Sequence, residues 1–249
     1  TSRAFFLQLN FDNDLFQDKN IRSAIAMAID KDGFVNVLLG GHGKVANGPF
    51  PMQDGDSLNY SFSPDKSKEL LSAAGWSDSD NDGYVDKDGK NFEINFLTYP
   101  GRSELPVLAQ SIQSNLKDIG IKVNINSTEN YLEVMKDSKA WDILASAMVT
   151  NPTGNKAYFF DMTSLSDSPK NRGHYSNAEL DELAKTLSTT FDSAKRDELA
   201  EQMSDILVDD CGFIFVSHLQ MSLVSKKNVK GLTPMPSDYY EFSKDLVIE

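Results

Sequence analysis

Four residues of one short segment, Asp78, Asp80, Asp82 and Gly83, have the spacing of a calcium-binding EF-hand loop. Alternate residues of a tight turn point toward one centre, so their carboxylates can share a cation. The twelfth position, where a bidentate glutamate belongs, is Gly89, and the flanking segments have helix and strand patterns rather than two helices. We therefore favour a solvated Asp/Gly hairpin over a calcium-binding structural module, because Asp and Gly suit such turns without a metal.

The residue types that commonly perform catalysis show no recognisable arrangement. His42, His174 and His218 are far apart in the chain, and neither a nucleophile elbow nor a triad spacing occurs. The alternative to a protein without catalytic activity is a carboxylate-based hydrolase that uses acids between Asp78 and Asp88. Such a pair needs one acid that is buried and has a raised pKa, and this loop is so polar that both acids should ionise normally. We therefore expect a protein that is not an enzyme.

One loop combines residues and a position that suit ligand binding. Residues 150–154, Thr-Asn-Pro-Thr-Gly, follow the apolar segment 141–149 and precede three aromatic residues at 158–160. Loops at the ends of strands in α/β sheets commonly hold ligands, and aromatic rings there offer stacking area with polar tips. Thr153, Asn155 and Tyr158 are the candidate contacts. A surface turn with Phe159 and Phe160 in the core explains the same pattern, and the residues leave both interpretations open.

His174 lies in a second polar loop, 171–175, with the sequence Asn-Arg-Gly-His-Tyr. An imidazole there can exchange protons and hydrogen bonds near neutral pH, so His174 is a further candidate contact. His218 follows an apolar segment and is expected to be structural. Cys211 is the single cysteine, which excludes an intrachain disulfide and predicts a buried thiol.

The charge of the chain argues against a nucleic-acid-binding protein. Its 249 residues include 24 Lys and Arg against 37 Asp and Glu, a formal net charge of −13. A hydrophobic content of 40% is enough for a substantial core, and no segment approaches the roughly 18 consecutive apolar residues of a membrane span. The chain starts at Thr1 without a basic and apolar leader, so we expect any export signal to have been removed or left out.

Apolar spacing predicts an α/β fold (mixed α+β) with a mixed sheet. Strand 92–96, helix 108–116 and strand 121–125 are joined by short links, which predicts a βαβ unit with parallel strands and a right-handed crossover. The other predicted elements are a strand at 4–11, helices at 21–29, 64–75, 131–136, 178–187 and 194–209, a strand at 141–145, and a strand pair at 213–216 and 222–224.

Several phrases, in order along nearly the whole chain, resemble the family 5 extracellular solute-binding proteins. These are the receptors of ABC importers for oligopeptides, dipeptides and nickel. The phrases are residues 20–30, 64–76, 98–102, 109–121, 175–181, 195–209 and 213–216. Whole receptors of the family resemble a clamshell of two lobes, and this chain is similar to the second half only. The resemblance therefore implies the C-terminal lobe of a type 2 periplasmic-binding-protein-like clamshell at residues 1–225. Residues 226–249 would be a tail that returns to the N-terminal lobe, which this sequence does not contain.

The resemblance also implies ligand contacts. Peptide receptors of the family hold the ammonium group of the peptide with an aspartate before the short aromatic helix. Residues 150–160 here contain no acid, and Asn151 and Asn155 are nearest. An amide brings no charge to such a contact, which weakens the case for an ordinary peptide. Nickel receptors of the family use a histidine after that helix, with arginines on the carboxylates of a chelator. That pattern implies His174 as a contact or metal ligand and, from the segment 98–102, Arg102 with Tyr99.

The implied function is that of the substrate-binding component of an ABC importer for peptide or nickel transport. The implied location is extracellular or periplasmic, with the protein held at the cell surface as a lipoprotein. The protein would capture a small peptide or a nickel chelate and deliver it to the permease subunits. The expected partners are the permease, the missing lobe and the ligand. Nucleic acid is not expected, and membrane contact would come only through an anchor outside these residues. No cofactor is expected, because a nickel chelate would be the transported ligand. A bound calcium ion is not favoured.

Overall fold

The computed structural model describes residues 1–51, 60–237, 239 and 242–249. Within these residues a central six-stranded sheet has the strand order β2-β8-β1-β7-β5-β6. Its strands are β1 (Arg3–Leu9), β2 (Gly43–Val45), β5 (Glu93–Thr98), β6 (Lys122–Ser127), β7 (Ile143–Val149) and β8 (Phe213–Leu219). Two small antiparallel strand pairs lie outside it: β3 (Asp86–Lys87) with β4 (Lys90–Asn91), which form a hairpin, and β9 (Val229–Lys230) with β10 (Val247–Ile248).

The sheet is mixed, as predicted. Strand β1 pairs antiparallel with both β7 and β8, whereas β5 pairs parallel with β6 and β7. The predicted βαβ unit is confirmed: β5 and β6 flank helix α4 (Glu104–Lys117), and Ile94 lies opposite Val123 in the parallel register. The fold class predicted from apolar spacing is therefore confirmed.

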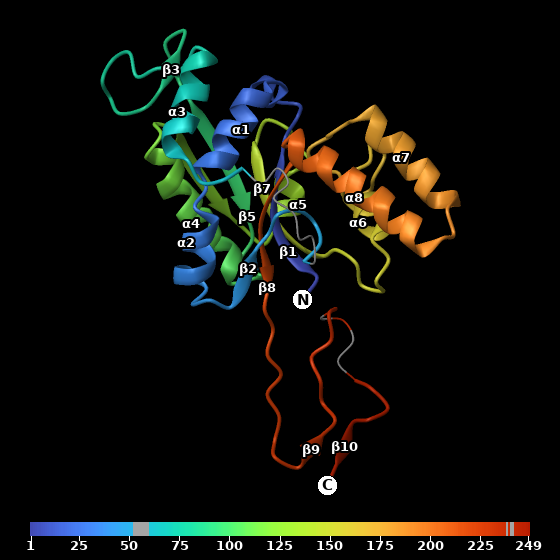
Figure 1. Ribbon diagram of the computed structural model, residues 1–249. Coiled ribbons are helices and arrows are strands. Elements are labelled where there is room, and N and C mark those ends of the chain that lie inside the picture. The colour runs from blue at the N-terminus through green and yellow to red at the C-terminus, as the bar shows by residue number, and fades with distance from the viewer. Residues whose placement is uncertain (52–59, 238, 240–241) are drawn as a thin grey trace.

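Helices cover both faces of the sheet (Figure 1). On one face lie α1 (Lys19–Ala28), α3 (Pro64–Ala73) and α4, together with the short turns η1 (Asp14–Gln17), α2 (Lys31–Gly33) and η2 (Phe34–Leu38). On the other lie α5 (Tyr131–Val134), α6 (Ala157–Thr163), α7 (Ala178–Thr189) and α8 (Ser193–Asp209). In the part of the chain that the structure describes, no helix combines the length and apolarity needed to cross a bilayer.

The side chains of β1 alternate between the two faces of the sheet, which explains why a hydrophobic core lies on each face. Phe5, Leu7 and Leu9 pack under α1 and α4, whereas Ala4 and Phe6 pack under α6 and α8. Successive side chains of a strand point to opposite faces, so a strand apolar at nearly every position must be covered on both sides. Strand β1 is buried along its whole length.

Local signals set the helix starts. Asp18 caps α1 by accepting a hydrogen bond from the backbone N–H of Asn20 at 2.8 Å. Asn177 caps α7 by accepting hydrogen bonds from the backbone N–H groups of Glu179 and Leu180. Asp192 caps α8 by accepting from the backbone N–H of Lys195 at 2.8 Å. Such side chains satisfy backbone donors that have no partner within the helix.

One predicted strand differs from the structure, and the structure decides between two interpretations of the aromatic run. The strand expected at 222–224 does not form, and β2 pairs with the outer edge of β8 instead. That edge is filled by a segment more than 170 residues away in sequence, which no local pattern reveals. Of the two interpretations of the aromatic run, the core one is right for Phe159 and Phe160, which are fully buried, while Tyr158 is half-buried.

Residues after β8 leave the body of the protein and reach the paired strands β9 and β10, well below the sheet in Figure 1. The segment then returns as far as the start of β1, where Ser2 donates its backbone N–H to the carbonyl oxygen of Pro236 at 2.7 Å. Several apolar side chains of this segment are exposed: Val224, Phe242, Val247 and Ile248.

His218 and Cys211 are both buried, as expected. Burial lowers the pKa of His218 to about 4, with smaller contributions from the N-terminal ammonium group and Lys44. Burial also raises the pKa of the Cys211 thiol to about 12. At neutral pH the structure therefore holds a neutral imidazole and a protonated thiol.

The lowered pKa of His218 predicts a loss of stability in acid. The folded state favours the neutral imidazole, so its contribution is complete above the ordinary pKa of about 6.5 and is lost as the pH falls toward about 4. Between about pH 7 and about pH 5, the free energy of unfolding should fall by about 2 kcal/mol more in the wild type than in His218→Gln. Urea unfolding followed by circular dichroism at each pH measures this. His42→Gln, at an exposed position, should retain the wild-type slope; equal slopes for all three proteins would refute the prediction.

Candidate functional site

An open groove of about 190 Å³ lies on the second face of the sheet, between α5 and the loop after α6. Its floor consists of side chains from two adjacent strands, Phe6 and Gln8 of β1 and Leu144, Ser146 and Met148 of β7. These positions alternate along each strand, so all five side chains point to the same face. The groove is therefore a gap that the helices of this face leave uncovered.

Gln8 fixes the middle of the groove. Its Nε2 donates to the hydroxyl of Ser146 at 3.4 Å, and its Oε1 accepts the backbone N–H of Arg172 at 3.0 Å. One amide thus joins β1, β7 and the loop after α6. A polar residue inside an otherwise apolar strand was the signal in the sequence that this position is special.

An aromatic wall borders the groove on the α5 side. Tyr99, just after β5, stacks on Tyr131 with ring centroids 4.4 Å apart and an interplanar angle of 21°. Leu132 and Met135 extend this wall. Burial raises the pKa of Tyr99, helped by the neighbouring phenol of Tyr131, so the Tyr99 hydroxyl stays protonated at neutral pH.

A cationic wall borders the groove on the other side. It is formed by Lys170 and Arg172, both exposed. Asn171 holds the loop between them, since its Nδ2 donates to the carbonyl oxygens of Leu165 at 3.0 Å and Tyr175 at 2.7 Å. Among the described residues, neither cation forms an ion pair and no acid lines the groove. The arrangement can therefore receive a negatively charged group.

The structure brings only some of the predicted contacts to this groove. Tyr99 lines it, and the half-buried Arg102 lies close enough for its charge to act on the Tyr99 phenol. The sequence-based candidates did not include Gln8, Tyr131, Ser146, Lys170 or Arg172. Ligand contact by Tyr99 and Arg102 stays a prediction.

His174 lies beyond the end of β1 and does not line the groove. The loop is tied there by Phe11, whose backbone N–H donates to the carbonyl oxygen of Gly173 at 2.7 Å, and the exposed imidazole turns to Asp12, with Nδ1 3.0 Å from its carboxylate. The end of β1 and the end of β7 are opposite ends of one antiparallel pair, about 20 Å apart for six residue steps. His174 is thus separated from the loop after β7, and its role as a contact or metal ligand stays a prediction.

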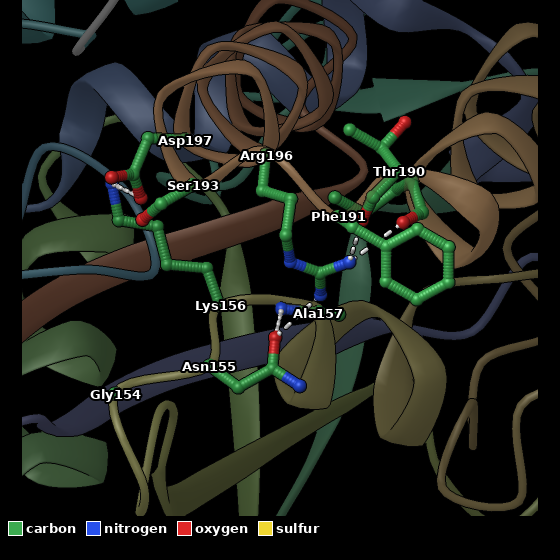
Figure 2. Close-up of a pocket in the computed structure, with 10 residues that line it drawn as sticks. Gly154, Asn155, Lys156, Ala157, Thr190, Phe191, Ser193, Arg196 and Asp197 are labelled. Carbon is green, nitrogen blue, oxygen red and sulfur yellow. Dashed lines mark hydrogen bonds and ion pairs between the residues drawn. The ribbon is translucent and has the colours of Figure 1, made fainter.

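Thr153 and Asn155 lie beyond the end of β7. Asn155 takes part in the fold itself (Figure 2). Its Oδ1 accepts from Arg196 Nη2 at 3.0 Å and from the backbone N–H of Ala157 at 3.1 Å. Arg196 Nη1 also donates to the carbonyl oxygens of Leu187 and Thr190, each at 2.8 Å. These bonds fix the start of α8 against α6 and border a hollow of about 480 Å³. The Asn155 amide oxygen is therefore already occupied, and ligand contact by Asn155, Thr153 and Tyr158 stays a prediction.

The acidic loop, residues 78–88, forms the hairpin expected from its sequence. Asp78 accepts backbone N–H groups of Asp82 and Gly83, and Asp86 accepts both the backbone N–H and the hydroxyl of Ser79. One oxygen each of Asp78, Asp80 and Asp86 lie within 4.8 Å of one another, and Asp86 is buried. The loop precedes the start of β5, and none of its acids lines the groove. A calcium ion there stays the less favoured alternative.

The fold and the groove together define one lobe of the periplasmic-binding-protein-like type, an α/β layer structure with an open groove on one face of its sheet. Residues 1–170 match the family described as bacterial extracellular solute-binding proteins, family 5 Middle. The chain belongs to this family, which confirms the resemblance found in the sequence.

Three relatives illustrate the likeness. The chain is 29% identical over 249 residues to the oligopeptide-binding protein AppA of Bacillus subtilis. It is 27% identical over 231 residues to the nickel-binding protein NikA of Staphylococcus aureus. The alignments cover 96% and 93% of this chain and 46% of each relative. AppA in complex with a nonapeptide superposes with a TM-score of 0.81 at 26% identity, over 94% of this chain and 48% of AppA.

A nickel ABC transporter structure from Bacillus halodurans gives the same TM-score of 0.81 at 28% identity, over 98% of this chain and 51% of that one. The chain thus spans about half the length of the relatives it matches. These relatives are binding proteins or transporter components by name.

Proposed function

We propose that this chain is the ligand-binding lobe of a substrate-binding component of an ABC importer, which captures a small peptide or a nickel chelate and delivers it to the permease. The observation that carries the proposal is membership of family 5 over residues 1–170, with relatives named for binding oligopeptides and nickel. Residues 1–225 would be the lobe and residues 226–249 the tail that returns to a second lobe. Its location would be extracellular or periplasmic, held at the cell surface by an anchor outside these residues.

The groove supports a binding role without catalysis. Lys170 and Arg172 offer charge, and Tyr99 and Tyr131 offer stacking, but none of the described residues that line the groove is an acid, a histidine or a cysteine. An open groove holds one side of a ligand, and a second lobe would close on the other side. Closure is driven by contacts that exist only in the closed state, so ligand binding becomes a signal that the permease can recognise.

Two measurements test this function. Native mass spectrometry of the full-length receptor, purified from its own cells, should detect a co-purified ligand. The mass of that ligand distinguishes a peptide from a nickel chelate. The 249-residue chain alone should bind weakly or not at all, because half of the contacts belong to the other lobe. A dissociation constant in the micromolar range for the chain alone would contradict this two-lobe proposal.

The hydrolase alternative has its own test. Asp80→Asn with Asp82→Asn removes two exposed carboxylates from the acidic loop. If the chain only binds, ligand affinity of the receptor should change less than about twofold, because the loop does not line the groove. Affinity is measured by calorimetry with the co-purified ligand, and a complete loss of function would favour the hydrolase instead. Added calcium should produce no heat with the wild type.

A further inference from the structure

The groove has opposite chemical characters on its two sides. The Tyr99–Tyr131 stack, with Leu132 and Met135, forms the aromatic wall, whereas Lys170 and Arg172 form the cationic wall. The floor between them carries the Gln8–Ser146 hydrogen bond. A ligand that fills this space meets positive charge on one side and apolar surface on the other.

We propose that the groove recognises a carboxylate through Lys170 and Arg172 while the Tyr99–Tyr131 wall binds an apolar or aromatic part of the same ligand. This deepens the proposed function and rests on it, because it names which end of the ligand this lobe binds. The carboxylate can belong to the C-terminus of a peptide or to a metal chelate. The guanidinium of Arg172 matches two carboxylate oxygens at once, and the Lys170 ammonium adds a point charge.

Local charge favours an anion here although the whole chain carries −13. At physiological ionic strength the screening length is about 8 Å, so distant acids contribute little and the groups that line the groove dominate. Both lining charges are positive, and among the described residues neither is neutralised by an ion pair. Among the described residues that line the groove, an ammonium group would meet these two cations and no carboxylate.

The backbone under the two cations is held in place before any ligand arrives. Lys170 donates its backbone N–H to Met162 at 2.8 Å, Arg172 donates its own to Gln8, and Gly173 accepts from Phe11. The loop is thus tied to α6 at one end and to β1 at the other. Binding then has to order only the two side chains, which lowers its entropic cost.

The size of the groove limits how much of the ligand it holds. Its volume of about 190 Å³ is below the 300–1,000 Å³ typical of complete small-molecule sites. It therefore accommodates one end of a ligand, such as a C-terminal residue with its carboxylate. The rest would extend toward the second lobe.

An amide NMR titration of the 249-residue chain tests the proposal, because it detects weak binding. The probes are acetyl-Phe-Leu, which carries only a carboxylate, and Phe-Leu-amide, which carries only an ammonium group. We expect acetyl-Phe-Leu to shift the amide signals of Gln8, Ser146 and Arg172 with a millimolar dissociation constant, and Phe-Leu-amide to bind at least about fivefold more weakly. Equal binding of both probes, or no shifts up to about 20 mM of either, would overturn the proposal.

Charge variants locate the effect. Lys170→Gln with Arg172→Gln should weaken acetyl-Phe-Leu about fivefold or more, whereas Phe-Leu-amide, no longer repelled by the two cations, should bind no more weakly than before. The matched control is Lys185→Gln with Lys195→Gln, which removes two exposed cations from α7 and α8 and should change neither affinity. If the control weakens acetyl-Phe-Leu equally, the attraction is a property of total charge and the proposal is wrong.

A third arm separates the two sources of the carboxylate. If nickel(II) bis-histidine shifts the same amide signals and histidine alone does not, the carboxylate belongs to a chelate. If only acetyl-Phe-Leu binds, the carboxylate belongs to a peptide. Either outcome supports the carboxylate site. A receptor that carries a co-purified ligand, but whose lobe shows no carboxylate preference, would disprove this inference and leave the proposed function standing. A receptor with no ligand in any form would instead disprove the function.

Discussion

Replacing Arg22 with methionine should lower the free energy of unfolding by about 3 kcal/mol, a large fraction of the stability of a domain of this size. Arg22 lies on α1 and is 5% exposed. Its guanidinium donates to the carbonyl oxygen of Phe16 at 2.8 Å, to the carbonyl oxygen of Asp210 at 2.7 Å and to the Asp210 carboxylate at 2.7 Å. It also lies over the ring of Phe11, 5.3 Å from the centroid.

The effect is large because one side chain connects three parts of the chain. Arg22 joins α1 to the end of η1 and to the end of α8, next to the start of β8. Methionine keeps the apolar stem but leaves carbonyl oxygens without donors and a carboxylate without its partner. The Asp210 side chain is 32% exposed and can be rehydrated, which places the loss at the lower end of the range for broken buried pairs.

Lys19→Met provides the matched control for Arg22→Met. Lys19 lies on the same helix and pairs with Asp209 at 3.0 Å, but both partners are about half exposed. Such surface pairs contribute about 0–1 kcal/mol, so this variant should be nearly neutral. Urea unfolding of both variants, followed by circular dichroism, gives the comparison. Equal losses would mean that net charge, rather than the buried hydrogen bonds, sets the stability.

Replacing Gly173 with alanine should cost about 3 kcal/mol and also displace Arg172 from the groove. A β-carbon at this position would lie 1.8 Å from the carbonyl oxygen of Leu9 and 2.8 Å from its carbonyl carbon. Both atoms belong to the backbone of β1 and cannot rotate away. The loop must move off the strand, which breaks the hydrogen bonds of Phe11 to Gly173 and of Arg172 to Gln8.

The two consequences of Gly173→Ala are measured separately. Urea unfolding gives the stability, and the NMR titration with acetyl-Phe-Leu gives the affinity of the groove. Gly101→Ala is the control, because a β-carbon there meets nothing closer than 3.8 Å and should leave stability nearly unchanged. A stable Gly173→Ala variant with wild-type binding would show that the contact with β1 does not position the cationic wall.

Local patterns determined most of the elements of this protein. The alternation of residues 92–96 and 121–125 and the helical spacing between them predicted the βαβ unit. In the structure, Asp18 caps the start of α1 through its own side chain. Family membership could also be read from the sequence, because phrases in a fixed order do not depend on the coordinates. Polar loops after apolar strands offered three separate candidate places for a ligand site and left a purely structural interpretation open.

Only the tertiary structure decided which of these places form one groove. Tyr99 meets Tyr131, and Gln8 meets Arg172, across separations of 32 and 164 residues that no periodicity connects. The structure also assigned Phe159 and Phe160 to the core, turned His174 to Asp12, and engaged Asn155 with Arg196. The physical reason is that hydrogen-bonding and burial periods act over one helix or strand. The groove instead depends on which strands become neighbours and which part of the sheet the helices leave uncovered.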